Sequence, residues 1–440
     1  MLTRRDLNRN DLHDRQFDGS RAQIHSNRRG IHIRERCRLV LFGAEQHPYA
    51  FFPIILANKS AQLIFTRAAR SLQRLLVRAK GSLQASEATR PLKGAIATAA
   101  EWVRANGHGS VVDIASDSPI EVPPGDVRCG AIPKALATPE TLLYPPLYAA
   151  VLPGVRILDG EGFAIVDDRL ILDMSPHYGR ASYDHSAMLR WRLPPLEHLD
   201  SKVLVLSGID PTNHYHWLLD ILPRFEVARL AGLDWDHMIA PTITPVQRTC
   251  LQRLGIDAKS VLPPPWNRQL LVREAVLAVF PSHRHGPSPF AVRFIRALFA
   301  DCLEPSAATP RRIFVSRSRC TQRRVTNEAQ VEIFLRGRGF TSIFLETMTI
   351  EDQARFFANA EIVVAPHGAG LTNAAFCSPG TRLIELFSSR HTPGFFRRLA
   401  AVCGLDYLCM VDGSQPYRWN GARCTGRDMH VDLGRLGRLL

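Results

Sequence analysis

The chain has 440 residues, of which 45% are hydrophobic and 22% are charged, and its formal net charge is +14. This length allows two domains that each bury a core, and the composition is typical of a globular protein. Residues 1–93 hold 18 Lys and Arg against 7 Asp and Glu, whereas the other residues hold 37 against 34, a net charge of only +3. The excess of positive charge therefore belongs to the N-terminal tail, which argues against nucleic acid as the partner of the folded body.

The nine cysteines are odd in number and widely spread, and no two have C-x-x-C spacing. This pattern indicates neither a disulfide framework nor a zinc site, so a reducing, cytoplasmic location is expected. No apolar signal segment follows Met1–Arg5, and prolines and polar residues interrupt the apolar run 39–57. Such an interrupted run is not typical of a transmembrane helix.

Residues 1–90 are expected to form a basic tail. The polar, Arg-rich composition of residues 1–36 is typical of a disordered leader. Residues 61–80 place leucines at helical spacing between arginines, which predicts a basic amphipathic helix. Such a helix suits peripheral contact with the inner face of the membrane, and it equally suits packing on the folded body.

Residues 91–285 are expected to form a first domain. The proline-dense part, residues 119–153, predicts extended segments and turns, and residues 155–174 predict hairpin strands. A buried strand is predicted at 202–207, a helix after the N-cap Asn213 with a kink at Pro223, a strand at 237–240 and a helix at 245–254. Asp167-Asp168 is interpreted as a solvated hairpin turn and Asp234-Trp-Asp236 as a surface connection between a helix and a strand, and neither is interpreted as a metal site.

Residues 286–440 are expected to form a second domain after a Pro- and His-rich hinge at 281–289. Apolar runs predict strands at 312–316, 342–346, 362–365, 382–387 and 407–411. Helical patterns lie between them, at 327–336, 350–360, from 371 onward and at 395–403. Alternating strands and helices predict a doubly wound parallel sheet, in which ligands bind at the carboxyl ends of the strands.

The segment His367-Gly-Ala-Gly-Leu371 lies at one such strand end. Its glycines let the backbone approach a ligand, and the first N–H groups of the following helix favour an anion. Arg317, between Ser316 and Ser318, follows the strand at 312–316. A guanidinium at one strand end and helix N–H groups at another would clamp a diphosphate.

Glu385 is an acid within an otherwise apolar strand, so its carboxylate needs donors. Ribose hydroxyls would supply them, and so would a structural arginine or backbone amides.

A second cluster combines Asn213, His214, His216 and Asp220. A helix places His216 and Asp220, four residues apart, on one face. Asp220 could then orient His216 as the base that deprotonates an acceptor hydroxyl, or Asp220 could be the base while His216 positions the substrate. Two histidines without a set of acids make a metal site unexpected.

The segment Asn213-His-Tyr-His-Trp-Leu-Leu-Asp-Ile-Leu-Pro-Arg224 has the pattern N-x-x-H-W-x-x-D-x-x-P-R. Because this pattern is the signature of glycosyltransferase family 61, the chain resembles that family. Further similarities, in the family's order, are Ser316-Arg317 with Arg323 and Asn327-Glu328, then Thr349–Gln353, then His367–Asn373, and then Pro379-Gly-Thr with Ile384-Glu385. The similarity spans about residues 200–390 and leaves residues 1–90 outside.

The resemblance implies a GT-B fold, with two Rossmann-like domains facing a cleft, the acceptor side at 91–285 and the nucleotide-sugar side at 286–440. It implies inverting hexosyl or pentosyl transfer, without an essential metal, to a glycan or lipid-linked glycan in capsular or exopolysaccharide synthesis. The implied catalytic residues are His216 and Asp220, and the implied acceptor-positioning residues are Asn213, His214 and Trp217. The implied nucleotide-sugar-binding residues are Arg317, Arg323, His367, Gly368, Ala369, Gly370, Leu371, Asn373 and Glu385.

Two other functions compete with this interpretation. A binding module could keep the nucleotide-sugar site without catalysis. A dinucleotide-dependent oxidoreductase is disfavoured, because no G-x-G-x-x-G follows a predicted strand.

Overall fold

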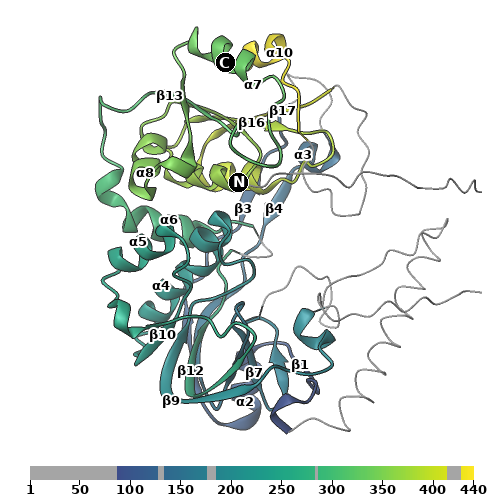
Figure 1. The fold of residues 1–440 in the computed structure, drawn as a ribbon, viewed down its shortest axis with the longest axis vertical. Helices are drawn as coiled ribbons and strands as arrows, with labels where there is room; N and C mark the ends of the chain where they lie inside the picture. The colour runs from purple at the N-terminus through teal and green to yellow at the C-terminus, as the bar shows by residue number, and fades with distance from the viewer. Residues whose placement is uncertain (1–86, 127–132, 176–184, 283–285, 414–427) are drawn as a thin grey trace, which may run out of the picture. The chain divides into compact units, whose positions relative to one another are not determined.

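The computed structural model describes residues 87–126, 133–175, 185–282, 286–413 and 428–440 (Figure 1). The expected disordered leader and the amphipathic helix at 61–80 lie outside these residues. Two β-sheets organise the described chain, and a small antiparallel pair of strands accompanies them. The predicted mixture of strands and helices is confirmed.

The first sheet has ten strands in the described chain. They are β1 (Gly94–Ile96), β2 (Ser110–Ile114), β5 (Leu147–Pro153), β6 (Arg156–Leu158), β7 (Phe163–Val166), β8 (Arg169–Ile171), β9 (Leu196–Val205), β10 (His237–Ile239), β11 (Val261–Leu262) and β12 (Gln269–Ala278). The order along the sheet is β1-β8-β7-β6-β12-β9-β10-β11, and β5 pairs with both β12 and β2.

This first sheet is mixed, so the expectation of a parallel sheet is correct only for part of it. The strands β12, β9, β10 and β11 are parallel neighbours. In contrast, β6, β7 and β8 form antiparallel hairpins, as their turn residues predict. Asp167 and Asp168 both have positive φ, at 50° and 57°, which is the backbone of a tight hairpin turn. Short two-residue turns leave no room for the crossover helix that parallel pairing requires.

The second sheet is fully parallel, in the order β14-β13-β15-β16-β17. Its strands are β13 (Arg312–Val315), β14 (Thr341–Ile343), β15 (Ile362–Pro366), β16 (Arg382–Phe387) and β17 (Asp406–Val411). In chain order this is a 2-1-3-4-5 sheet, and its topological switch point lies between β13 and β15. The predicted doubly wound parallel sheet is confirmed here.

The helices and the β3–β4 pair complete the described chain. The α-helices are α2 (Ala99–Asn106), α3 (Lys134–Ala137), α4 (Pro223–Leu230), α5 (Pro245–Arg253), α6 (Pro289–Leu298), α7 (Glu328–Arg336), α8 (Ile350–Ala358), α9 (Phe395–Cys403) and α10 (Leu433–Gly437). The shorter helices are η1 (Glu87–Thr89), η3 (Ser186–Leu189), η4 (His216–Ile221), η5 (Ala258–Ser260), η7 (Ala300–Cys302), η8 (Leu345–Thr347) and η9 (Ala369–Phe376), and the pair consists of β3 (Ile120–Val122) and β4 (Glu140–Leu142). Helix α6 has no counterpart among the predicted elements.

Alternating side chains cover both faces of the second sheet. Phe314 and Val364 belong to a core cluster with residues of α7 and α10. Their neighbours Ile313 and Val363 point the other way, into a cluster with residues of α8 and α9. Because successive side chains of a strand face opposite sides, the continuous apolar runs of these strands require helices on both faces.

The segment that carries β3, α3 and β4 packs against the second sheet, although it precedes most of the first sheet in sequence. Arg397 of α9 donates through Nη1 to the Pro123 carbonyl at 2.6 Å and through Nη2 to Glu140 at 2.6 Å. Leu136 is fully buried against Phe387 of β16. A domain boundary at residue 285 stays a prediction, but this early segment belongs with the later sheet by its contacts.

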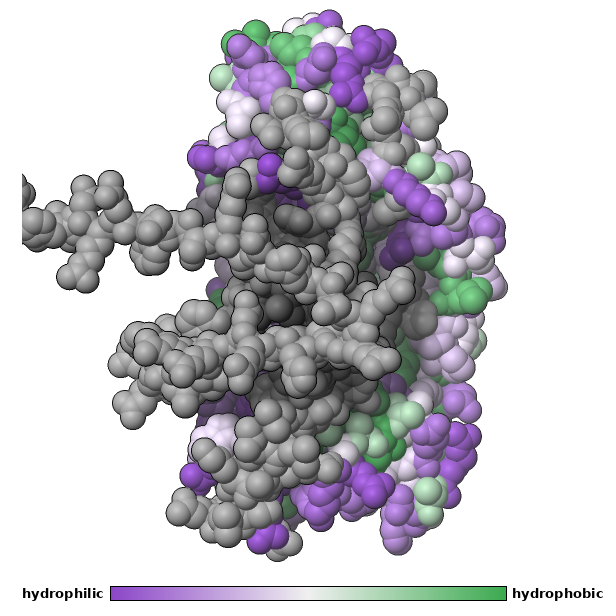
Figure 2. Space-filling model, turned by 90° about the vertical axis from the view of Figure 1, so that its right-hand side faces the viewer, coloured by the Kyte–Doolittle hydropathy of each residue, from purple (hydrophilic) through white to green (hydrophobic). Residues whose placement is uncertain are grey.

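The described helices are all too short or too polar to cross a bilayer. On the face shown in Figure 2, hydrophilic residues predominate in the described chain and hydrophobic ones form small separate patches.

Candidate functional site

The first cluster lies on the helical segment after β9. Asn213 caps it as predicted, because its Oδ1 accepts the Tyr215 N–H at 3.0 Å. The next turn, η4, is a π-helix, in which the Leu222 N–H reaches back five residues to the Trp217 carbonyl at 2.9 Å. Pro223 then opens α4, and its missing N–H and bulky ring account for the widened turn before it. Single π-turns inside helices frequently occur at functional sites.

His216 and Asp220 form a hydrogen-bonded pair on this turn, as their spacing predicts. Asp220 Oδ2 accepts from His216 Nδ1 at 2.6 Å, and the two side chains are 4% and 16% exposed respectively. Since an ionised carboxylate only accepts hydrogen bonds, Nδ1 carries the proton and Nε2 is the nitrogen that would take one from a substrate. Asp220 Oδ1 is buried and has no hydrogen-bond partner within the described chain.

Trp217 departs from its expected role. The indole is 1% exposed and belongs to the main core cluster, so it anchors the π-turn and does not reach an acceptor. Arg224, at the end of the same motif, is likewise fully buried. It donates to the carbonyls of Ser207 and Ala278, both at 2.7 Å, and burial lowers its pKa to about 9.

The second cluster forms at the switch point of the parallel sheet. Arg317 follows β13 and Gly368 follows the neighbouring strand β15. A Cβ atom on Gly368 would lie 2.3 Å from Arg317 Nη1, so only a glycine lets the guanidinium approach this closely. The predicted meeting of these two strand ends is confirmed.

Arg323 joins Arg317 in this cluster. Its φ of 56° is unusual for a residue other than glycine, and such backbone strain concentrates at functional sites. Burial, and then the positive charge of Arg317, lower the pKa of Arg323. In the parts of the chain that the structure describes, neither guanidinium forms an ion pair with a carboxylate. Arg317 Nε is buried without a partner there, and its Nη2 donates only to the Gln322 carbonyl at 3.0 Å. Two neighbouring cations of this kind suit an anionic ligand.

His367 and Glu385 are hydrogen-bonded to each other. Glu385 Oε1 accepts from His367 Nδ1 at 2.5 Å, and Glu385 Oε2 accepts from the Tyr407 hydroxyl at 2.6 Å. Glu385 is fully buried and the His367 ring is stacked on Phe387, with 5.2 Å between the ring centroids. The donors of Glu385 are thus neither ribose nor the arginine or amides expected from the sequence. Both of its oxygens are engaged inside the protein, which corrects the expectation of direct ribose binding.

His391 was not identified from the sequence, yet it belongs to this cluster. Its ring centroid lies 5.1 Å from that of His367. Burial, then the charges of His367 and Arg323, lower the pKa of His391 to about 4. The run Ser388-Ser-Arg-His391 directly follows β16, so the strand-end rule that identified Arg317 could also have found it.

Other residues after β15 serve the framework. The helix predicted from Leu371 onward is a 3-10 helix that runs from Ala369 to Phe376. Leu371 is 1% exposed and Asn373 is fully buried. Asn373 Nδ2 donates to Gln353 Oε1 at 2.7 Å, and Asn373 Oδ1 bonds His214 Nε2 at 3.1 Å. The side chains of Leu371 and Asn373 were expected to contact the ligand, but they are buried, and Asn373 forms its hydrogen bonds within the protein.

The two clusters adjoin each other. Besides the bond between His214 and Asn373, aromatic rings connect them. The Tyr215 ring lies 5.6 Å from that of His216 and 6.1 Å from that of Phe396, and the Phe396 ring lies 5.4 Å from that of His367. The structure therefore places the His216–Asp220 pair near the second cluster, hereafter the cationic cluster, although Arg317 and Arg323 lie about 100 residues and His367 about 150 residues further along the sequence.

The described chain contains no group of three or more His, Cys, Asp or Glu side chains suited to a metal ion. Asp167 and Asp168 occupy a hairpin turn, and Asp234 and Asp236 lie in the connection between α4 and β10, as expected. Asp234 pairs with Lys202, and Asp168 pairs with Lys93 and Arg156.

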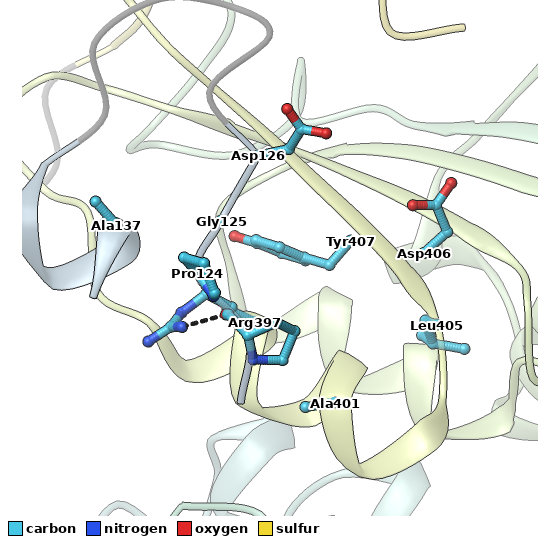
Figure 3. A pocket seen from close by; sticks show the side chains of 10 residues that line it. Pro124, Gly125, Asp126, Ala137, Arg397, Ala401, Leu405, Asp406 and Tyr407 are labelled. Atoms are coloured by element: carbon cyan, nitrogen blue, oxygen red, sulfur yellow. Dashed lines mark hydrogen bonds between the residues drawn. The ribbon is translucent and has the colours of Figure 1, made fainter. Parts of the chain in front are cut away.

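A cavity of about 470 Å³ lies beside α9 and the edge strand β17 (Figure 3). Its walls include Pro124, Arg397, Leu405 and Tyr407. Tyr407 is the connection to the second cluster, since its ring lines the cavity while its hydroxyl bonds Glu385. The candidate site is defined by the convergence of its polar groups and not by this cavity, because the polar wall residues Arg397, Asp406 and Tyr407 already form hydrogen bonds with other groups of the protein.

Residues 214–384 match the family model described as Glycosyltransferase 61. Over this range the chain is similar to the glycosyltransferase 61 family. The matched range contains the His216–Asp220 pair, Arg317, Arg323 and His367, and it ends one residue before Glu385.

A curated protein that is similar to this chain is the beta-1,2-xylosyltransferase of Arabidopsis thaliana, which is 33% identical over 66 residues. The alignment covers 15% of this chain and 12% of the plant protein. The chain thus spans about an eighth of that relative's length.

Proposed function

We propose that this protein is a glycosyltransferase that moves a sugar from a nucleotide-sugar donor to a hydroxyl group of a glycan acceptor. The observation that carries the proposal is the pair of guanidinium groups of Arg317 and Arg323, without carboxylate partners in the described chain, at a sheet switch point that a row of aromatic rings connects to the His216–Asp220 pair. The arrangement supplies a diphosphate site and a base, and it lies within the glycosyltransferase 61 match.

The donor diphosphate would bind at the ends of β13 and β15. Each guanidinium can hold phosphate oxygens with two parallel hydrogen bonds. The short approach between Arg317 and Gly368 places a charged group beside the backbone N–H groups that open η9. These donors would stabilise the negative charge that develops on the leaving nucleoside diphosphate.

The acceptor hydroxyl would lose its proton to His216 Nε2, with Asp220 holding the opposite nitrogen protonated. The acceptor oxygen forms the new bond to the anomeric carbon as the bond to the diphosphate breaks. A single base and a single displacement give inversion at that carbon, and we propose this outcome. We also propose that the cationic side chains of the donor site make an added metal unnecessary.

The proposal also specifies the type of fold and the biological role. The two sheets and the adjoining clusters support a GT-B-like arrangement, with the donor on the second sheet and the acceptor on the first. A glycan or lipid-linked glycan of a surface polysaccharide is the proposed acceptor, and a pentose such as xylose is a reasonable first donor sugar because of the plant relative.

The test combines binding with transfer. Calorimetry should show binding of one of UDP, GDP or dTDP, and UDP-, GDP- and dTDP-sugars including UDP-xylose should be assayed for hydrolysis and transfer, with and without EDTA. Absence of binding to every nucleotide would refute the proposal. Binding without hydrolysis or transfer on any acceptor would instead identify an inactive binding module, and loss of activity in EDTA would refute the metal-independent mechanism.

A further inference from the structure

The chain Tyr407–Glu385–His367 crosses three neighbouring parallel strands. Tyr407 lies in β17, Glu385 in β16, and His367 directly follows β15. Both links are short, at 2.6 Å and 2.5 Å, and Glu385 has no exposed surface. The outer end of this chain is the Tyr407 ring in the wall of the cavity (Figure 3), and its inner end is an imidazole in the cationic cluster.

A carboxylate in this position is costly for stability. Its strand neighbours Ile384 and Leu386 are fully buried, and in the described chain Glu385 has no lysine or arginine within ion-pair distance. Removing a carboxylate from water costs several kcal/mol, which packing alone would not justify, because an apolar side chain would fill the space better. The burial of Glu385 therefore indicates a function that requires a carboxylate. We expect this function to be exerted on His367, to which Glu385 is hydrogen-bonded.

The hydrogen bonds determine where the protons lie. Burial, and then the charge of Glu385, raise the pKa of Tyr407 well above its usual value, so the phenol stays a neutral donor. Glu385 Oε2 accepts the hydrogen bond of that phenol, and Oε1 must accept a hydrogen bond from His367, since an ionised carboxylate cannot donate. Nδ1 of His367 is therefore protonated, and Nε2 becomes the nitrogen that can serve the site.

We propose that Glu385 and Tyr407 are positioning residues that orient His367 and hold its Nδ1 proton, so that the ring takes a second proton from water as the diphosphate of the sugar donor binds and donates through Nε2–H to a diphosphate oxygen, with the Glu385 carboxylate stabilising the imidazolium. This proposal rests on the proposed function for the identity of the ligand. Glu385 thereby contributes to donor binding through His367 and not by contact with ribose.

If packing alone positioned His367, replacing Glu385 by glutamine would leave ligand binding unchanged. Phe387 stacks on the His367 ring at an interplanar angle of 21°, and Phe396 lies at 5.4 Å, so the ring keeps its plane without Glu385. A glutamine at position 385 has the same shape but presents either its oxygen or its NH₂ group to Nδ1. It preserves the packing while it no longer dictates which ring nitrogen is protonated.

The first experiment measures the affinity of the full chain for the nucleoside diphosphate that it binds best and for the matching monophosphate. The variants are Glu385→Gln and Tyr407→Phe, and the control is Tyr144→Phe, which removes another half-buried hydroxyl, bonded to the Pro287 carbonyl at 3.1 Å. Because one hydrogen bond is worth about 1 kcal/mol, the diphosphate should bind about fivefold more weakly to Glu385→Gln and, since Tyr407 acts only through Glu385, about threefold more weakly to Tyr407→Phe. The monophosphate, and the control variant, should change less than about twofold on the same scale. Equal losses for diphosphate and monophosphate, or no loss, would overturn the proposal.

The second experiment observes the tautomer directly. With ¹⁵N-labelled histidine, two-bond correlations of the free protein should show His367 protonated at Nδ1, with the signals identified by their loss in His367→Gln. Glu385→Gln should add the Nε2-protonated form. A wild-type ring protonated only at Nε2, or an unchanged tautomer in Glu385→Gln, would refute the positioning role. Because this measurement needs no ligand, it separates failure of the positioning role from failure of the proposed function, which absence of all nucleotide binding would reveal.

Discussion

Replacing Asp220 by asparagine tests the proposed base most sharply. Asparagine keeps the shape of the side chain, and its amide oxygen can still accept a hydrogen bond from His216 Nδ1. It removes the negative charge that lies 2.6 Å from the imidazole in a site where Asp220 is 3% exposed. The perturbation is therefore electrostatic, and the fold should survive it.

The size of the effect follows from this geometry. A hydrogen bond to a charged group contributes about 1.5–3 kcal/mol, and the imidazolium exists only when the acceptor has given up its proton. Losing that contribution in the transition state lowers kcat by about 10- to 150-fold. His216→Ala removes the base altogether, which should lower kcat by about 10²- to 10⁴-fold. Nucleotide affinity should stay unchanged in both variants, because the proposed diphosphate site is the other cluster.

The assay is steady-state transfer with the donor found above, together with calorimetry of the nucleoside diphosphate. Glu226→Gln is the matched control, since this acid lies on the adjoining helix α4 and pairs with Arg229 at the surface. A kcat for Asp220→Asn within about threefold of wild type, or about 0.65 kcal/mol, would refute the role of Asp220. A larger loss for Asp220→Asn than for His216→Ala would make Asp220 the base and His216 the positioning group.

Three further predictions concern the cationic cluster. Arg317→Ala should weaken nucleoside diphosphate binding by about 10- to 150-fold, since charged hydrogen bonds are lost, and leave nucleoside binding unchanged; the surface variant Arg319→Ala should change neither in calorimetry. Gly368→Ala should weaken diphosphate binding with little change in Tm. The new Cβ would lie 2.3 Å from Arg317 Nη1 and displace this flexible guanidinium, whereas the backbone φ of 173° suits any residue. Unchanged affinity would contradict the close approach. His391→Gln should reduce the loss of stability between pH 6.5 and about 4, measured by urea unfolding: burial and the charge of His367 lower the folded-state pKa to about 4, so the unfolded chain binds more protons there and wild-type stability falls as pH falls. An identical pH profile in the variant would show that His391 titrates normally.

Much of the candidate site follows from local patterns in the sequence. The continuous apolar runs predict strands β13, β15 and β16, and the polar residues after them lie at one edge because parallel strands end together. Arg317 and Gly368 could therefore be expected to meet. The spacing of His216 and Asp220 likewise predicts their contact, since a helical turn repeats over about four residues.

Tertiary structure alone decided the partners of the buried polar groups. Nothing near Glu385 in sequence indicates Tyr407, because their contact depends on the order and register of β16 and β17, which the strands' own residues do not specify. The same holds for the bond between His214 and Asn373, which joins two segments about 160 residues apart. Burial is also a property of the whole fold, and for this reason Trp217 was expected beside the acceptor but lies in the core. The sequence by itself thus determined which residue types stand at the strand ends and on the helical turn. Only the packing of distant segments decided which of them face the site and which hold the others in place.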